Sequence, residues 1–375
     1  MLFRIHFFPA FFLLLLGIGL EFEIARRLLK TYSRTVVVVG LVLSTPLLLL
    51  GYLLEFERFA RYFGMWWATW IICAAMLELL VLAVAGFAMV YWNSAREFRP
   101  ARRVVLQGAG TALCLMPGVA AAFGIVNRNR FQLSEVDIPV PNLAKDLVGL
   151  RIVQITDIHL SPFLSESEFA HAIDMANETK ADLALVTGDL ISRRGDPLDA
   201  CLRQLARLRA DAGVLGCMGN HERFAGIESY VTREGQRIGI EFLRHQAKVL
   251  RFGAARINFA GVDYQKFGAP YLTGVERLIV PDALNVLLSH NPDVFPVAAQ
   301  QGYHLTIAGH THGGQVDFEI LSQHVNVARV YTPYVRGLYH NAGSSLYVST
   351  GLGTIGVPMR IGAPPEVSLI RLCAI

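Results

Sequence analysis

Four long apolar segments occupy the first third of the chain and constrain its fold more than any other feature. They lie approximately at residues 2–20, 35–54, 65–91 and 104–126. A helix needs roughly 17–25 residues to cross the hydrocarbon core of a bilayer, so each segment is long enough to span it. The first segment resembles a signal peptide in length, but it lacks a convincing cleavage site and three more apolar segments follow. We therefore expect a membrane domain of about four transmembrane helices over residues 1–130, with a lipid bilayer as its partner.

Basic residues in the loops between these segments predict an orientation. The loops after the first and third segments carry eight of them: Arg26, Arg27, Lys30, Arg34, Arg96, Arg99, Arg102 and Arg103. The opposite side has five: Arg4, Arg58, Arg61, Arg128 and Arg130. Because cytoplasmic loops are enriched in Lys and Arg, this difference favours the first and third loops inside. The chain is then a multi-pass protein of the cell (inner) membrane, and the part after residue 130 lies on the extracytoplasmic side.

One carboxylate, Glu78, falls in the middle of the third apolar segment. An ionisable group at this depth is costly and is often functional, as in a transporter. No second polar stripe accompanies Glu78, which favours a carboxylate that is hydrogen-bonded inside the helical bundle.

The distribution of charge argues against nucleic acid as a partner. Residues 1–130 hold 13 Lys and Arg but 6 Asp and Glu, whereas the rest of the chain holds 21 basic and 24 acidic residues. The net positive charge thus comes from loops between apolar segments, and the second part carries no Lys- or Arg-rich stripe. The five cysteines show no CxxC spacing and are interpreted as buried free thiols: Cys73, Cys114, Cys201, Cys217 and Cys373.

The sequence pattern changes at about residue 131, where short β-rich runs begin to alternate with helical segments. This alternation is typical of an α/β domain, here expected over residues 131–375. A capping box formed by Ser165 and Glu168 marks the start of one helix. Five apolar runs are predicted to be strands: 151–156, 183–187, 214–218, 284–289 and 304–308.

Each of these runs ends in residues that can bind a metal. The first precedes Asp157 and His159, and the others precede Asp189, Asn220, His290, and the pair His310 and His312. In open α/β sheets, ligands bind at the carboxyl ends of the strands, so these side chains are expected to converge. Side chains alternate along an extended segment, which predicts that Asp157 and His159 face the same side. The glycines before Asp189, Asn220 and His310 are expected to provide sharp turns.

The ligand types indicate two metal ions. Carboxylate, amide and imidazole groups suit divalent or trivalent Mn, Fe or Zn, and no thiolate is present to select softer metals. Two ions about 3.5–4 Å apart require a shared carboxylate. Single histidines outside this pattern are interpreted as surface or core residues: His171, His245, His304, His324 and His340.

The motifs DIH, GD, GNHE, a lone His and GHTHGGQ occur in this order and resemble the calcineurin-like metallophosphoesterase superfamily. The segments 334–339, 348–353 and 360–366 make the chain most similar to the membrane-associated YkuE/YaeI-type branch. The resemblance covers about residues 134–375. It implies an N-terminal transmembrane helical bundle followed by a four-layer α/β/β/α sandwich.

The resemblance also implies roles for individual residues. One metal would be bound by Asp157, His159, Asp189 and His312; the other by Asp189, Asn220, His290 and His310. His221 would contact the scissile phosphate or protonate the leaving group, oriented by Glu222 or another carboxylate. The family often has GDxxD after the second strand, whereas Ser192 occupies the later Asp position here. The loop arginines Arg193, Arg194 and Arg360 are interpreted as solvated charges.

The function that these residues imply is the hydrolysis of a phosphodiester or phosphomonoester by a metal-bridged hydroxide. The substrate would be a phosphoester near the bilayer, either a phospholipid or a nucleotide-lipid. Two alternatives stay open. One is an enzyme of the UDP-2,3-diacylglucosamine pyrophosphohydrolase type in lipid A synthesis, which needs a cytoplasmic site. The other is a membrane sensor whose phosphoesterase-like domain is not catalytic.

Overall fold

The computed structural model describes residues 120, 123–266, 270–320, 323–341, 343–356 and 358–375. The chain divides into two compact units, Met1–Val126 and Asn127–Ile375. The first three expected membrane segments and most of the fourth lie outside the described residues. Among the residues that are described, no helix combines the length and the apolar character needed to cross a bilayer.

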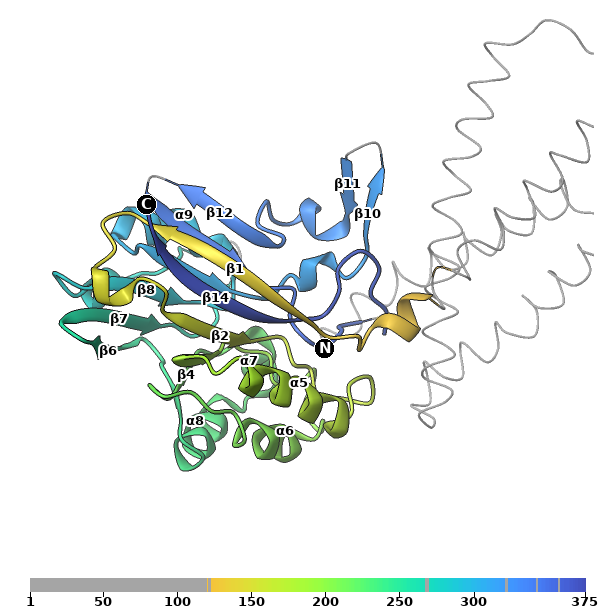
Figure 1. Ribbon diagram of the computed structural model, residues 1–375. Coiled ribbons are helices and arrows are strands. Elements are labelled where there is room, and N and C mark those ends of the chain that lie inside the picture. Colours follow the sequence, from red (N-terminus) through yellow and green to blue (C-terminus); the bar gives the residue numbers. More distant parts are fainter. Residues whose placement is uncertain (1–119, 121–122, 267–269, 321–322, 342, 357) are drawn as a thin grey trace, which may run out of the picture. The chain divides into compact units, whose positions relative to one another are not determined.

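The second unit contains two six-stranded sheets, shown in Figure 1. The first has the order β1-β14-β2-β3-β4-β5, in which β14 runs antiparallel to β2 and every other pair is parallel. Its strands are β1 (Gln132–Val140), β2 (Arg151–Ile155), β3 (Leu183–Val186), β4 (Val214–Gly216), β5 (Ile240–Phe242) and β14 (Glu366–Ala374). The sheet thus joins the beginning of the domain to its end.

The second sheet has the order β12-β13-β9-β8-β7-β6 and is antiparallel only at its two outer pairs. Its strands are β6 (Gln246–Phe252), β7 (Ala255–Gly261), β8 (Leu284–Leu288), β9 (Leu305–Ala308), β12 (Gly337–Asn341) and β13 (Ser344–Val348). A separate hairpin is formed by β10 (Asp317–Ile320) and β11 (Gln323–Asn326).

The two sheets pack face to face through a shared apolar core. Ile152 and Leu185 of the first sheet lie in one cluster with Phe259, Val286 and Ile307 of the second, and all five are buried. Their strands are short runs of branched and aromatic residues, which suit a sheet that is covered on both faces.

Helices cover both outer faces of this pair of sheets. They are α5 (Glu166–Glu178), α6 (Leu198–Leu205), α7 (Asn220–Ala225), α8 (Glu228–Arg237) and α9 (Phe295–Gln301). Phe169 of α5 and Leu205 of α6 pack against Val186 on the first sheet, whereas Ala298 of α9 packs against Leu287 on the second. The domain is therefore an α/β sandwich of two mixed sheets.

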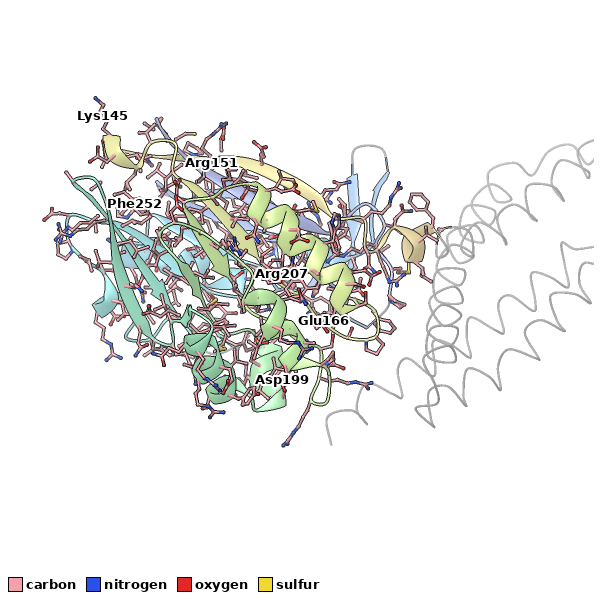
Figure 2. All side chains as sticks on the ribbon, turned by 60° about the horizontal axis from the view of Figure 1, so that its bottom comes forward. Lys145, Arg151, Glu166, Asp199, Arg207 and Phe252 are labelled. Atoms are coloured by element: carbon pink, nitrogen blue, oxygen red, sulfur yellow. The ribbon has the colours of Figure 1, made fainter. Side chains whose placement is uncertain are left out.

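Short one-turn 3-10 helices complete the connections between these elements. They are η1 (Lys145–Leu147), η2 (Glu276–Leu278), η3 (Pro292–Val294), η4 (His312–Gly314) and η5 (Val327–Val330). The outer surfaces of α5 and α6 are joined by an ion pair in which Arg203 Nη2 lies 3.1 Å from Glu166 Oε2. Figure 2 shows Glu166 among the side chains of this surface.

The expected strands are confirmed to within two residues at each end. Three of them, β2, β3 and β4, lie side by side in the first sheet, and β8 and β9 are neighbours in the second. The capping box is also confirmed: the Ser165 hydroxyl accepts from the Glu168 N–H, and the Glu168 carboxylate accepts from the Ser165 N–H. These five strands end at the same region of the molecule, where the polar residues that follow them meet.

Candidate metal centre

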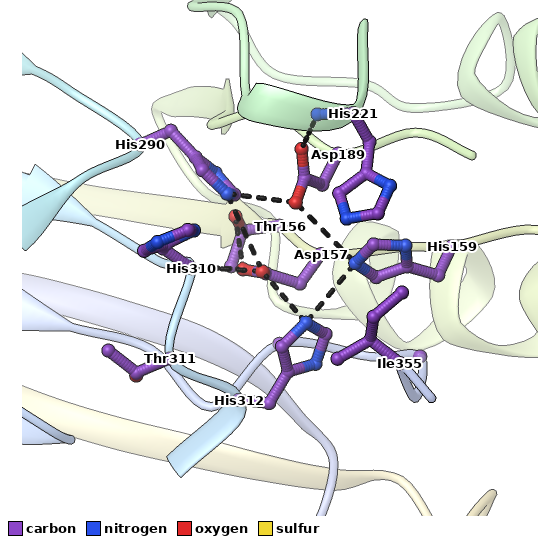
Figure 3. Close-up of polar contacts among 12 residues, drawn as sticks. Thr156, Asp157, His159, Asp189, His221, His290, His310, Thr311, His312 and Ile355 are labelled. Atoms are coloured by element: carbon purple, nitrogen blue, oxygen red, sulfur yellow. Dashed lines mark hydrogen bonds and ion pairs between the residues drawn. The ribbon is translucent and has the colours of Figure 1, made fainter. Parts of the chain in front are cut away.

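Six of the seven expected ligands form two groups of three at this edge (Figure 3). The first group contains Asp157, His159 and His312, and the second contains Asp189, His290 and His310. Within each group, the potential ligand atoms all lie within 4.8 Å of one another. The loops after β2 and β9 supply the first group, while loops after β3, β8 and β9 supply the second.

One oxygen atom lies between the two groups. Oδ2 of Asp189 is 2.9 Å from Nε2 of His290 and 3.5 Å from Nε2 of His159. Both imidazoles and the Asp189 carboxylate are buried. A carboxylate in this position can bridge two cations, since each of its neighbours belongs to a different ligand group.

The seventh expected ligand, Asn220, is the first residue of α7. Its side chain is buried, and its Oδ1 atom has no hydrogen-bond partner in the described part of the chain. A buried amide oxygen without a partner is costly, and a cation would satisfy it. In the first group, Nε2 of His159 and Nε2 of His312 are 3.1 Å apart, so at least one of the two nitrogens presents a lone pair to the other. The donor set therefore fits metal ions.

Burial keeps three of the imidazoles neutral. Desolvation lowers the pKa of His310 to about 4, and the neighbouring His290 contributes in the same direction. Desolvation likewise holds the pKa of His159 and of His312 well below the ordinary value, together with repulsion from His312 and from Arg360 respectively. Neutral imidazoles carry the lone pair that a metal requires.

His290 differs from these three histidines. Burial acts to lower its pKa, but the carboxylates of Asp189 and Asp157 outweigh burial and raise it to about 10. Its Nδ1 atom lies 2.7 Å from the Thr187 carbonyl oxygen, which can only accept, so Nδ1 is the donor. Nε2 of His290 therefore faces Asp189. A cation bound between these two groups would take the place of the proton on Nε2.

The sequence comparisons agree with this geometry. A model of the calcineurin-like phosphoesterase family matches residues 150–314. The chain is 31% identical over 293 residues to "Transmembrane protein with metallophosphoesterase domain" of Danio rerio, covering 73% of this chain and 65% of that relative. It is 29% identical over 233 residues to "Uncharacterized metallophosphoesterase YkuE" of Bacillus subtilis (strain 168), covering 60% of this chain and 79% of the relative.

This chain carries a calcineurin-like metallophosphoesterase domain. A solved structure of phosphopantetheinyl hydrolase from Mycobacterium tuberculosis aligns with 14% identity and a TM-score of 0.35 over 54% of this chain and 89% of that chain. The chain spans just under two thirds of the Danio rerio relative.

The backbone of the metallophosphoesterase domain is left-handed at five of the expected ligands. The φ angles are positive at Asp157 (48°), His159 (47°), Asp189 (57°), His310 (77°) and His312 (52°). The expectation that Asp157 and His159 lie on an extended segment is therefore wrong, although both side chains do face the centre. A non-glycine residue with positive φ costs on the order of 1 kcal/mol or more, and such strain is concentrated at functional sites.

The three glycines that precede ligands have different roles. Only Gly188 has a positive φ, at 94°, and fits the expected sharp turn. At Gly219, an added Cβ would collide with the Asp189 carboxylate, and at Gly309 it would collide with the Asp157 carboxylate. These two glycines are therefore needed for space rather than for a turn.

Glu222 supports the loop that carries Asp189. Its buried carboxylate accepts hydrogen bonds from the N–H groups of Gly219 (2.7 Å), Asp189 (2.9 Å) and Leu190 (2.7 Å). The proposed orientation of His221 by Glu222 is wrong. Instead, the ring Nδ1 of His221 donates to the carbonyl oxygen of Ser192. The backbone N–H of His221 donates to Oδ1 of Asp189 at 2.9 Å.

Ser192, which replaces the second Asp of the family motif, thus contacts His221 through its backbone. Its hydroxyl also lies 3.1 Å from Nδ1 of His159. The Ser192 N–H in turn donates to Oδ2 of Asp196 at 3.1 Å. The sequence marked Ser192 only as a departure from the family motif, and its contacts with both histidines were not predicted.

The interpretation of Arg360 as a solvated loop charge is wrong. Its side chain is buried, and its guanidinium donates to backbone carbonyls that include those of Thr350 (2.9 Å), Ala363 (3.1 Å) and His312 (3.3 Å). No sequence motif signals this role, since the acceptors are backbone atoms. Arg193 and Arg194 are exposed, as expected.

The remaining polar residues play structural roles. Cys201 and Cys217 are buried free thiols, as expected, whereas Cys373 is only partly buried, so the expectation fails there. His304 accepts a hydrogen bond from the Asn285 N–H at 3.0 Å. Cys73 and Cys114 lie outside the described residues.

Proposed function

We propose that this chain is a membrane-anchored, binuclear metal-dependent phosphoesterase. The observation that carries this proposal is the shared carboxylate: Oδ2 of Asp189 lies 2.9 Å from a ligand of one group and 3.5 Å from a ligand of the other. The expected reaction is the hydrolysis of a phosphodiester or a phosphomonoester. An anchored site meets substrates at the bilayer surface, which makes lipid phosphoesters the favoured class.

The ligand assignment follows the two groups. One ion would be held by Asp157, His159, Asp189 and His312, and the other by Asp189, Asn220, His290 and His310. This mixture of oxygen and imidazole ligands suits Mn, Fe or Zn. When bound, the pair of ions would supply a nucleophile by lowering the pKa of water and would neutralise charge on the phosphoryl oxygens.

His221 is the residue proposed to act on the substrate itself. A ring nitrogen of His221 lies within 4.8 Å of ligand atoms of His159 and Asp189, so the imidazole borders both ligand groups. The Ser192 carbonyl engages Nδ1, which leaves Nε2 for the substrate. From there His221 can protonate the leaving oxygen or bind a phosphoryl oxygen.

We also propose the domain organisation: a membrane domain over residues 1–130 and a phosphoesterase domain over 131–375. The apolar segments support the anchor. A further support is that the Danio rerio relative is itself named as a transmembrane protein.

The loop charges favour a multi-pass protein of the cell membrane with an extracytoplasmic catalytic domain. A C-terminal alkaline-phosphatase fusion tests the sidedness, because the reporter folds only outside the cytoplasm; an inactive fusion would favour the nucleotide-lipid pyrophosphohydrolase.

The activity is tested with the full chain in detergent, loaded with Mn²⁺ and assayed on chromogenic mono- and diesters. Asp189→Asn is expected to lose hydrolysis and at least one of two bound ions, measured by elemental analysis. Asp211→Asn, at an exposed residue, is the matched control and is expected to keep both. A wild-type protein that binds two ions but hydrolyses neither ester class would overturn the proposal and favour the sensor.

A further inference from the structure

A cavity of about 240 Å³ opens next to the metal centre. Its wall is formed by residues from three segments: Met218, Gly219, Arg223, Glu228, Asp263 and Tyr264. Gly219 directly precedes the ligand Asn220, and the ring centroid of Tyr264 lies 5.6 Å from that of His310. The cavity is therefore on the side of the second ligand group, within reach of a substrate whose phosphorus lies at the centre.

Aromatic rings form a continuous row between this cavity and the centre. The ring centroid of Phe224 is 5.8 Å from that of His221 and 6.4 Å from that of Tyr264. Both contacts are edge-to-face, a favourable arrangement for aromatic pairs. Phe224 is nevertheless 71% exposed, which is unusual for a residue of this size. Its free surface is thus available to a ligand beside His221.

Charges around the cavity leave one cation for an anionic ligand. Arg244 donates to both oxygens of Asp263, at 2.8 and 2.7 Å, and also interacts electrostatically with Glu228. Arg244 is thus engaged by the two acidic side chains of the wall. In the part of the chain that the structure describes, the Arg223 guanidinium forms no hydrogen bond or ion pair. It is exposed and lines the cavity.

We propose that Arg223, Phe224 and Tyr264 form the substrate-binding wall of this site. Arg223 binds a phosphoryl oxygen, and the two rings hold a planar, ring-bearing organic group of the phosphoester. The inference rests on the proposed function, which supplies the phosphoryl group. It narrows the substrate to phosphoesters whose organic part presents a flat apolar face near phosphorus. An aromatic platform favours such groups through stacking, and Arg adds charge-assisted hydrogen bonds.

The test uses the full chain in detergent, loaded with Mn²⁺, and measures binding of inorganic phosphate, phenyl phosphate and hexyl phosphate by calorimetry. Wild-type protein is expected to bind phenyl phosphate about tenfold more tightly than either of the other two, as one stacked ring contributes a factor of about this size. Phe224→Ala and Tyr264→Ala should abolish this preference while leaving phosphate binding unchanged. Arg223→Ala should weaken all three ligands about tenfold, and Arg223→Lys should restore part of the loss.

Val249→Ala is the matched control, because Val249 is an exposed apolar residue in the middle of β6. The metal content of each variant is measured too, and only variants that keep wild-type metal content are compared. Phe224→Leu is the conservative substitute if Phe224→Ala fails to fold. Equal binding of phenyl and hexyl phosphate, or unchanged binding in the Arg223 and Phe224 variants, would overturn the inference.

Hydrolysis separates this inference from the proposed function. If the wild-type protein shows the binding preference but cleaves no ester, the wall is supported and the proposed activity fails. If it cleaves p-nitrophenyl esters and the three alanine variants have wild-type KM values, the activity is supported and the wall is rejected.

Discussion

The backbone N–H of Asp189 donates a 2.9 Å hydrogen bond to Oε2 of Glu222, a side chain with no exposed surface. The same carboxylate accepts two more N–H groups, from Gly219 and Leu190. One side chain thus holds the backbone of the loop that carries Asp189. This links a residue of the GNHE motif that is not itself an expected ligand to the position of Asp189.

Glu222→Gln is expected to destabilise the domain and to reduce its metal content below two ions. An amide has one acceptor oxygen, so at least one buried N–H would face the NH₂ group, and each buried unpaired donor costs about 1–3 kcal/mol. The free energy of unfolding and the bound metal are measured together. Glu178→Gln, at an exposed position, is the control. Wild-type metal content in Glu222→Gln would show that this carboxylate does not hold the Asp189 loop.

Ser192→Ala is expected to weaken metal binding about tenfold, with little change in stability. The hydroxyl lies 3.1 Å from Nδ1 of His159, and partners of this kind orient a metal-binding imidazole. Ser192→Asp should bind metal at least as tightly as the wild type, since a carboxylate is the stronger acceptor. Competition with a chromogenic chelator measures the affinity, and Ser229→Ala on the exposed surface of α8 is the control. Equal affinities of wild type and Ser192→Ala would contradict the role.

Arg360→Met is expected to lower the free energy of unfolding by at least about 2 kcal/mol, because several buried carbonyls lose their donor. Arg360→Lys should be intermediate, since an ammonium has fewer donors and lacks the planar fork of a guanidinium. The His312 carbonyl is one of the acceptors, so metal content should fall with stability. Chemical denaturation and elemental analysis measure the two effects. Arg194→Met, at an exposed residue, should behave like the wild type.

The strands of the site and the convergence of its ligands could be predicted because both depend on local pattern. An apolar run such as Val214–Gly216 must be buried, and the polar residues after it must lie at the end of a strand. The resemblance to the calcineurin-like metallophosphoesterases then implied that Asp189 and His290 lie together. The pairing of β1 with β14 could not be predicted in this way, since it joins Gln132 to Glu366 without any local signal.

The supports of the site were harder to predict because their partners are backbone atoms. Arg360 is surrounded by carbonyl oxygens, and every residue type has one, so no motif marks its burial. The His221 ring likewise donates to the Ser192 carbonyl rather than to a carboxylate. The backbone at Asp157 is left-handed, whereas the sequence pattern indicated an extended segment. Residue type therefore indicates which side chains converge, but not which groups orient them.

The capping box of α5 provides a pH-dependent prediction. Ser165→Ala is expected to cost about 1 kcal/mol at pH 7, the usual effect of removing an N-cap side chain. In the native state the Ser165 hydroxyl and N–H donate to Oε2 of Glu168 at 2.7 and 2.8 Å. Burial acts to raise the pKa of Glu168, but hydrogen bonds from Ser165 and Asn129 outweigh it, so the pKa is lowered.

Because the folded pKa of Glu168 is depressed, the stabilisation is present above the unfolded value, about 4.3, and is lost as the pH falls through the lower folded value. The difference in unfolding free energy between wild type and Ser165→Ala should thus be largest at pH 6–7 and should shrink below about pH 4. Thermal unfolding across this range measures it. Glu168→Gln is the matched background, since it lacks the titrating group. The effect of Ser165→Ala on the unfolding free energy, measured in the Glu168→Gln protein, should not change with pH. A difference that grows on acidification would show that the Glu168 carboxylate does not stabilise this helix end.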